Sequence, residues 1–232
     1  MQQAAKPAPA PQPAKPKPSG PPPEFQEKEI ATMDAAGLVR ILSDGGASEF
    51  RKAKACMRAG ELGAKEAVPA LAALLDDEHL SVYARYGLEP IEDASALAAL
   101  RAALTKLKGD RLIGVVNSLG KRRDAQASAA LVKMLNGADV DLASAAAAAL
   151  GGIGNAASAK DLLAVMGKSK GLFQMAVADA CLVCAERMIA DGQRDQGLAL
   201  YAKLTGPEVP KAARLAAMSG VIREETSPAR PR

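Results

Sequence analysis

Side chains that could carry out catalysis or bind a metal are scarce in this 232-residue chain. His79 is the only histidine, which excludes any zinc site that needs two or more histidines. A nucleophilic dyad of Cys56 with His79 would need a third orienting group and a pocket. Glu78 and His79 fall between two expected helices, where a turn is the simpler interpretation. We therefore expect no catalytic residue, no cofactor and no metal.

A Cys-x-x-Cys motif, Cys181 and Cys184, is the other arrangement with chemical potential. This motif is typical of redox proteins when it lies beside a βαβ unit. Here it lies inside a long helical stretch, residues 173–189, with no strand before it. Because cysteine in a helix usually packs as a small hydrophobe, we expect core packing, and a labile thiol pair or a metal site are the alternatives. The redox state of Cys56, Cys181 and Cys184 stays open at this stage.

The elements that would position these residues are indicated by a repeat of apolar pairs, each pair spaced four positions apart. The first members of successive pairs are 33, 29, 31, 31 and 38 residues apart, a spacing typical of stacked supersecondary units. Two helices of about 10 to 15 residues and two turns fill such a unit and leave no room for a strand. The sequence therefore predicts an all-α fold, a right-handed α-solenoid of about five to six helix pairs with one continuous core. The pairs are Leu38/Leu42, Leu71/Leu75, Leu100/Leu104, Leu131/Leu135, Leu162/Met166 and Leu200/Leu204.

Glycine and proline mark the expected helix ends. Leu62-Gly63, Leu119-Gly120 and Ile153-Gly154 predict ends, because glycine tolerates the left-handed conformation just past a helix C-terminus. In the second repeat Pro90 follows Glu89 at the corresponding place. It still stops the helix, since proline has no amide hydrogen to donate.

Composition divides the chain into three parts. Nine of the 15 prolines lie in residues 1–23, which we expect to be a disordered, extended Pro/Lys-rich tether. Residues 24–222 form the predicted solenoid body, and residues 223–232 a second disordered tail. No run of about 18 apolar residues occurs, so we expect no membrane span. The Gln-Gln-Ala-Ala start followed by the tether is typical of an exported protein, periplasmic or extracellular, whose signal peptide has been removed; a cytoplasmic protein with a disordered tail is the alternative.

Charge is segregated within the body. The two tails account for the whole formal net charge of +4, so the basic isoelectric point is poor support for nucleic-acid binding. Residues 61–93 hold eight acidic against two basic side chains, whereas residues 94–123 hold seven basic against one acidic. We interpret these charges as solvated faces and inter-repeat ion pairs. The alternative is a bipolar patch that steers a charged partner or another copy of the solenoid.

Three segments resemble the core of secreted bacterial HEAT-repeat proteins. They are LSVYARYGLEPI (residues 80–91), KLKG (residues 106–109) and GVVNSLGKRRD (residues 114–124). KEAVPAL (residues 65–71) is similar to the bilin-lyase-type HEAT-like consensus. The resemblance covers about residues 48–222. It implies an α-solenoid of the kind often found beside secreted hydrolase or cytochrome-type domains, with no settled activity of its own.

The resemblance also implies structural roles for individual residues. In HEAT-like repeats an aspartate at the start of the second helix and a nearby arginine tie one repeat to the next, and Asp124 and Arg123 match those positions. Asp124 is also well placed as an N-cap of the helix that it opens. Residues 194–204 are similar to a tetratricopeptide-type helix, which makes the last repeat atypical.

Two clusters are candidate partner-binding surfaces. Arg85 and Glu89 are four positions apart and would form an ion pair on one helical face, beside Tyr83 and Tyr86. A structural role and a recognition site are both open for this cluster. The second cluster is the basic run of residues 121–123, and we expect that reversing its charges weakens partner capture without unfolding the body. The candidate residues are Tyr83, Arg85, Tyr86, Glu89, Lys121, Arg122 and Arg123.

These observations predict a non-catalytic protein–protein interaction scaffold with a concave helical-repeat surface. Its expected partner is a protein or the catalytic module of the same parent polypeptide. One alternative is a bilin-lyase-like accessory protein or chaperone that holds a chromophore or a target subunit. The other is a nucleic-acid binder that uses residues 121–123. A lyase-like protein would bind a tetrapyrrole, and a DNA binder would lose its ligand steeply with salt.

Overall fold

A computed structural model of the chain describes residues 28–226, which form thirteen α-helices, two short 3-10 helices and no strand. The all-α fold predicted from the sequence is confirmed. The predicted tether and the last six residues lie outside the described range. The elements are α1 (Lys28–Ala31), α2 (Ala35–Ser43), α3 (Glu49–Glu61), η2 (Lys65–Ala67), α4 (Val68–Ala73), α5 (Ser81–Leu88), α6 (Ala94–Ala103), α7 (Gly109–Lys121), η3 (Ala125–Ala127), α8 (Ser128–Leu135), α9 (Val140–Ile153), α10 (Ala156–Met166), α11 (Gly171–Ala190), α12 (Arg194–Lys203) and α13 (Lys211–Thr226).

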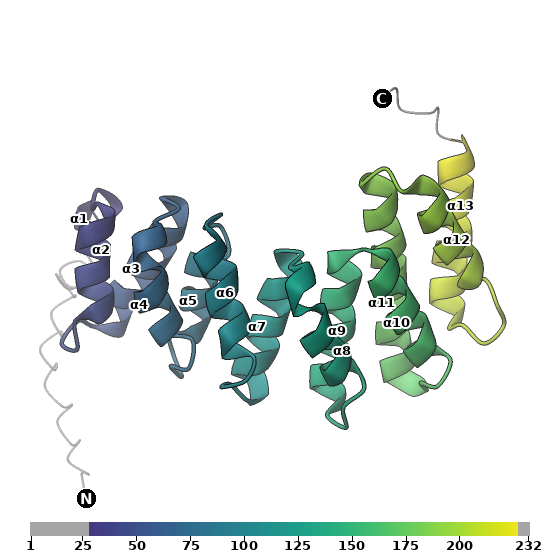
Figure 1. Cartoon of the computed structure of the whole chain (residues 1–232), viewed down its shortest axis with the longest axis horizontal. Helices are drawn as coiled ribbons and strands as arrows, with labels where there is room; N and C mark the ends of the chain where they lie inside the picture. Colours follow the sequence, from purple (N-terminus) through teal and green to yellow (C-terminus); the bar gives the residue numbers. More distant parts are fainter. Residues whose placement is uncertain (1–27, 227–232) are drawn as a thin grey trace, which may run out of the picture.

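The helices follow one another along the long axis of the molecule, with α1 and α13 at opposite ends (Figure 1). Each helix packs mainly on helices one or two places away in the chain. The odd-numbered helices from α3 to α13 form a row in which each contacts the next, and the even-numbered helices pack alongside them. Consequently, the contacts that hold the described fold together are local in sequence.

The recurring apolar pairs lie in the core, as predicted. All twelve of their side chains are buried, and they belong to one continuous hydrophobic cluster that runs from Ile30 to Ala217. The last interval is longer than the others because α11 has 20 residues. The repeat in the sequence is therefore a repeat of buried side chains along the molecule.

Small residues bring the odd-numbered helices close together. A Cβ atom added to Gly120 in α7 would lie 2.5 Å from the Cα of Ala149 in α9. A Cβ atom added to Gly151 in α9 would lie 2.5 Å from the carbonyl oxygen of Ala180 in α11. Both distances are far below van der Waals contact, so these two interfaces require glycine.

The helix ends predicted at glycine are confirmed at two of the three positions. Gly63 and Gly154 adopt the left-handed conformation, with φ of 61° and 66°. The predicted end at Gly120 is wrong, because α7 continues past this residue and Arg123 takes the left-handed position with φ of 53°. The physical reason is that Gly120 serves the close packing on Ala149 inside the helix, and so the turn falls three residues later.

The stop at Pro90 is confirmed, since α5 ends at Leu88. The predicted boundary of the body is wrong at its C-terminal side, because α13 continues to Thr226, beyond residue 222. Residues 223–226 continue a helix that is buried along one side, which explains why the helix extends beyond the point where the composition changes.

Among the described helices, none combines the length and the apolar character needed to cross a bilayer.

Candidate functional site

The predicted cluster on α5 and α7 forms a polar junction between these two helices. Glu89, which directly follows α5, is only 9% exposed and accepts a hydrogen bond of 2.8 Å from the hydroxyl of Ser118. The Lys121 ammonium group lies 2.5 Å from the other carboxylate oxygen of Glu89. A buried carboxylate is costly unless it is paired, so these two groups of α7 stabilise Glu89 in its buried position.

Arg85 also reaches from α5 to α7. Its Nη1 donates to the carbonyl oxygen of Gly114 over 3.3 Å, and its guanidinium occupies the space where a Cβ atom of Gly114 would lie. The expected ion pair between Arg85 and Glu89 is therefore wrong for the described structure: both side chains turn toward α7 and not toward each other. The interface offers Arg85 a backbone carbonyl and Glu89 the buried hydroxyl of Ser118 as partners, whereas an exposed ion pair on one helix contributes little.

Arg122 caps the C-terminus of α5. Its Nη1 donates to the carbonyl oxygens of Glu89 at 2.7 Å, Ile91 at 2.6 Å and Leu88 at 3.2 Å. The carbonyl of Leu88 also accepts from the amide of Ile91, and the negative end of the helix dipole favours a cation beside these oxygens. Arg122 thus stabilises the end of α5 and the turn that contains Pro90.

Arg123 joins two loops that are 68 residues apart in the chain. Its Nη1 lies 3.0 Å from Asp191, its Nη2 donates to the second oxygen of Asp191, and Nη2 also lies 3.3 Å from the carbonyl of Ile153. The hydrogen bond from Arg123 lowers the pKa of Asp191 below its ordinary value. Arg123 therefore ties the turn after α7 to the turns after α9 and α11.

Ion pairs also connect neighbouring helix pairs at other points. Asp124 accepts a 2.6 Å hydrogen bond from Arg101 of α6 and caps η3 through the amide of Gln126. The N-cap role predicted for Asp124 is confirmed. Arg111 of α7 lies 2.9 Å from Asp76 of the turn after α4, so it joins the basic and the acidic segment. These contacts agree with the interpretation of the segregated charges as inter-repeat ion pairs.

The remaining members of the cluster are the two tyrosines. Tyr83 is half-buried against the core, whereas Tyr86 is exposed. Lys121 keeps most of its side chain exposed while it pairs with Glu89. The guanidinium groups of Arg122 and Arg123 are already bonded within the chain, so we now expect that reversing the charges of residues 121–123 destabilises the body.

The potentially reactive residues lie where the sequence placed them. His79 lies in the turn between α4 and α5, and its backbone amide donates to Asp77. Cys181 and Cys184 are fully buried in α11, which confirms their predicted packing in the core. Burial raises the pKa of Cys181 to about 12 and that of Cys184 to about 11. Within the described range, no group of three or more His, Cys, Asp or Glu side chains is placed to hold a metal ion.

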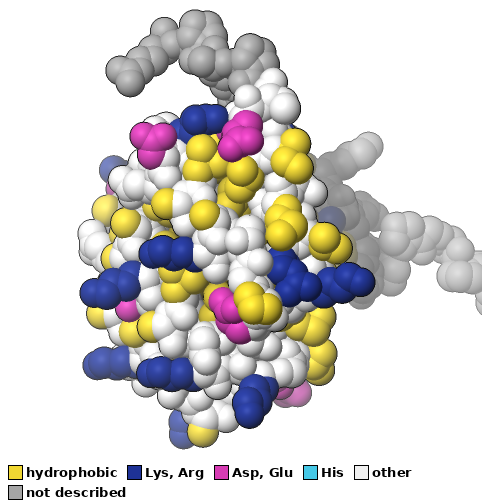
Figure 2. Space-filling view, turned by 90° about the vertical axis from the view of Figure 1, so that its right-hand side faces the viewer, with side chains coloured by type: hydrophobic (Ala, Val, Ile, Leu, Met, Phe, Trp, Pro, Cys, Tyr) yellow, Lys and Arg dark blue, Asp and Glu magenta, His cyan; other side chains and the backbone are white. Residues whose placement is uncertain are grey.

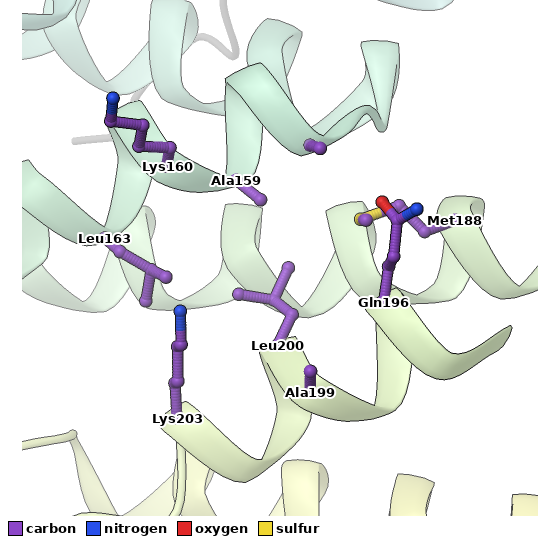
Figure 3. A pocket seen from close by; sticks show the side chains of 9 residues that line it. Ala159, Lys160, Leu163, Met188, Gln196, Ala199, Leu200 and Lys203 are labelled. Carbon is purple, nitrogen blue, oxygen red and sulfur yellow. The ribbon is translucent and has the colours of Figure 1, made fainter. Parts of the chain in front are cut away.

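A groove of about 370 Å³ lies between α10 and α12, with a side chain of α11 at its base (Figure 3). The two outer helices contribute residues at the same helical spacing of i, i+3, i+4 and i+7, which places each set on one helical face. The lining residues are Ala156, Ala159, Lys160 and Leu163 of α10, Met188 of α11, and Gln196, Ala199, Leu200 and Lys203 of α12.

Small side chains explain why this space stays open. Ala156 and Ala159 on one wall and Ala199 on the other project only a methyl group into it. Meanwhile α12 is held close to α11 by Gly197, where an added Cβ atom would lie 2.8 Å from the carbonyl oxygen of Ala185. Because α12 packs closely on α11 and the side chains that α10 and α12 direct at each other are small, a groove remains between these two helices.

The groove combines an apolar base with a polar rim. Met188 and Leu200 are buried, and Leu163 is half-buried. Lys160 and Lys203 are exposed, one on each wall, and Figure 3 shows Lys203 extending from α12 toward Leu163. The residues that line the groove include two lysines and no carboxylate. The arrangement suits a ligand that carries an apolar group together with negative charge.

Sequence reasoning did not identify this groove. A usable signal exists, because residues 156–163 and residues 196–203 show the same facial spacing with one lysine each. However, the two segments are about forty positions apart, and only the packing of α10 and α12 on α11 brings them together. The chain matches none of the family models and none of the curated proteins with which it was compared.

Proposed function

We propose that this chain is a non-catalytic protein–protein interaction scaffold that holds a segment of its partner in the groove between α10 and α12. The observation that carries the proposal is the groove itself, with an apolar base and a lysine on each wall. The partner is a protein or the catalytic module of the same parent polypeptide.

The architecture that we propose for the scaffold is a right-handed α-solenoid of about five to six HEAT-like helix pairs. Support comes from the regular interval of the buried apolar pairs and from the local packing of helices one and two places apart. The HEAT-like segments around residues 80–91 and 114–124 support the same assignment. Repeat architectures of this type present elongated surfaces, and their common use is to bind other proteins.

The chemistry of the groove defines the partner segment. Leu163, Leu200 and Met188 offer contact to one large apolar side chain. Lys160 and Lys203 favour carboxylates on either side of that anchor, because opposite charges complement one another across an interface. The fitting segment is therefore an acidic peptide, helical or extended, with a leucine-like anchor at its centre.

A titration with synthetic peptides tests the proposal. Fluorescein-labelled peptides of about a dozen residues, with one central leucine flanked by glutamates, are added to the full chain, and fluorescence anisotropy is measured at low and high salt. The matched peptide carries lysines in place of the glutamates. We expect the acidic peptide to bind and the basic one not to bind, with weaker binding at high salt.

Charge reversal locates the binding site. Two exposed ion pairs together contribute up to ~2 kcal/mol, so the double variant Lys160→Glu/Lys203→Glu should lose about tenfold to thirtyfold in affinity. The matched control, Lys133→Glu/Lys168→Glu, changes the net charge equally at two exposed lysines outside the groove. Equal affinity of both double variants for the acidic peptide, or no binding by the unmodified chain, contradicts the proposed site.

A further inference from the structure

The outer face of the last described helix carries an apolar stripe. Leu215, Met218 and Ile222 of α13 are 53%, 42% and 60% exposed. Their spacing of three and four residues places them on one side of the helix, one above the other. Figure 2 shows hydrophobic side chains on the upper half of this end of the molecule, and most of the lysine and arginine side chains below them.

The opposite face of α13 makes the contacts that hold it to the body. Ala213, Ala217 and Gly220 are buried. The ring of Tyr201 in α12 covers Gly220, where an added Cβ atom would lie 2.7 Å from two ring carbons. The packing of α13 on α11 and α12 thus uses mainly small residues, together with partly buried Val221, and Leu215, Met218 and Ile222 point the other way. The outer stripe is not needed for the described fold.

The charges of α13 are complementary to those of a second copy in the opposite direction. The helix begins at exposed Lys211 and has exposed Glu225 in its last turn. If two α13 helices lie antiparallel with the stripes in contact, Leu215 lies opposite Ile222 of the second copy. In the same register Lys211 lies near Glu225 of the second copy, at both ends of the pair. The two helix dipoles also run in opposite directions.

We propose that two copies of this chain associate end to end through α13, in an antiparallel pair related by a two-fold axis. Such an interface is isologous, so the same stripe serves both copies and the assembly closes as a dimer. Two helices of sixteen residues bury less than the ~1,200 Å² typical of stable complexes, so the dimer is weak, with a dissociation constant of about 10–100 µM. The dimer leaves the groove between α10 and α12 outside the interface.

Sedimentation equilibrium of the full chain, from about 2 to 300 µM, tests the proposal. We expect the average mass to rise from that of the monomer toward that of the dimer and no further. Leu215→Glu/Ile222→Glu should remain monomeric at every concentration. Val140→Glu is the matched control, because Val140 is an exposed apolar side chain at the start of α9, in the middle of the row of helices, and this variant should dimerise like the unmodified chain.

A charge swap keeps the test independent of any loss of folding. Lys211→Glu should weaken the dimer about tenfold, and adding Glu225→Lys to the same chain should restore it. A monomer at 300 µM overturns the proposal, as does a dimer that survives Leu215→Glu/Ile222→Glu or masses that grow beyond the dimer. Failure of the peptide titration at the groove does not affect this result, since the two surfaces share no residue.

Discussion

Substitution of Gly151 by alanine tests whether direct backbone packing holds α9 against α11. The added Cβ atom would lie 2.5 Å from the carbonyl oxygen and 3.0 Å from the Cα of Ala180. Ordinary van der Waals contact begins at 3.4 Å, so the shortfall is about 0.9 Å. Both atoms belong to the backbone of α11, and no side-chain rotation can relieve the clash. The two helices must therefore separate.

Two opposing effects set the size of the change. Alanine is more favourable than glycine inside a helix by ~1 kcal/mol. Overpacking lowers stability by ~1–3 kcal/mol. Part of this cost arises because a gap of 0.5–1 Å between the helices removes about a quarter to a half of the dispersion energy of each contact. Because the helix-propensity gain offsets part of the overpacking cost, we expect Gly151→Ala to lower the free energy of unfolding by ~1–2 kcal/mol. For a chain of this length that corresponds to a fall in Tm of about 2–8 °C.

Gly167→Ala is the matched control. Gly167 ends α10 in a right-handed conformation, and an added Cβ atom would meet nothing closer than 4.0 Å. This variant should unfold within about 0.5 kcal/mol of the unmodified chain or be slightly more stable. Urea and thermal unfolding followed by circular dichroism measure both variants, and amide hydrogen exchange locates the loss to α9 and α11. If Gly151→Ala proves as stable as Gly167→Ala, the close approach of α9 and α11 is refuted.

Two further predictions follow from the site. Arg122→Ala should lower the free energy of unfolding by ~2 kcal/mol, because it removes a charged donor from three carbonyl oxygens at the end of α5. The control Arg40→Ala, at an exposed position, should change the free energy of unfolding by less than about 0.5 kcal/mol. Urea unfolding measures both variants, and equal effects would show that the cap by Arg122 contributes nothing. Cys181 and Cys184 should react with a thiol reagent at pH 8 only after unfolding. Their folded pKa values of about 12 and about 11 exceed the ordinary value of 9.0, so the unfolded thiols ionise first and the free energy of unfolding should fall as the pH rises above 9. Rapid reaction of the folded protein with the thiol reagent would contradict the buried placement of the two cysteines.

The sequence alone was enough to predict the all-α fold and the apolar faces that the helices bury. The apolar pairs, such as Leu71/Leu75 and Leu131/Leu135, predict buried helical faces because their spacing matches the helix and their interval matches one helix pair. The stops at Gly63, Pro90 and Gly154 follow from backbone chemistry that each residue carries with it. These properties are local, and neighbouring residues are sufficient to determine them.

Partner choice among side chains required the tertiary structure. Arg85 and Glu89 have the ideal spacing for a pair on one helix, yet α7 provides Gly114 and Lys121 as alternatives that the local pattern does not contain. Gly120 has the sequence context of a helix end, but the approach of α9 keeps it inside α7.

The same distinction applies to the candidate surfaces. The facial spacing of residues 156–163, 196–203 and 215–222 can be read directly from the chain. Periodicity indicates that a helix has a face, because a side chain repeats with the turn of its own helix. Whether that face is filled, left as a groove or turned outward depends on helices that lie elsewhere in the sequence. Only the packing of α10, α11, α12 and α13 determined it.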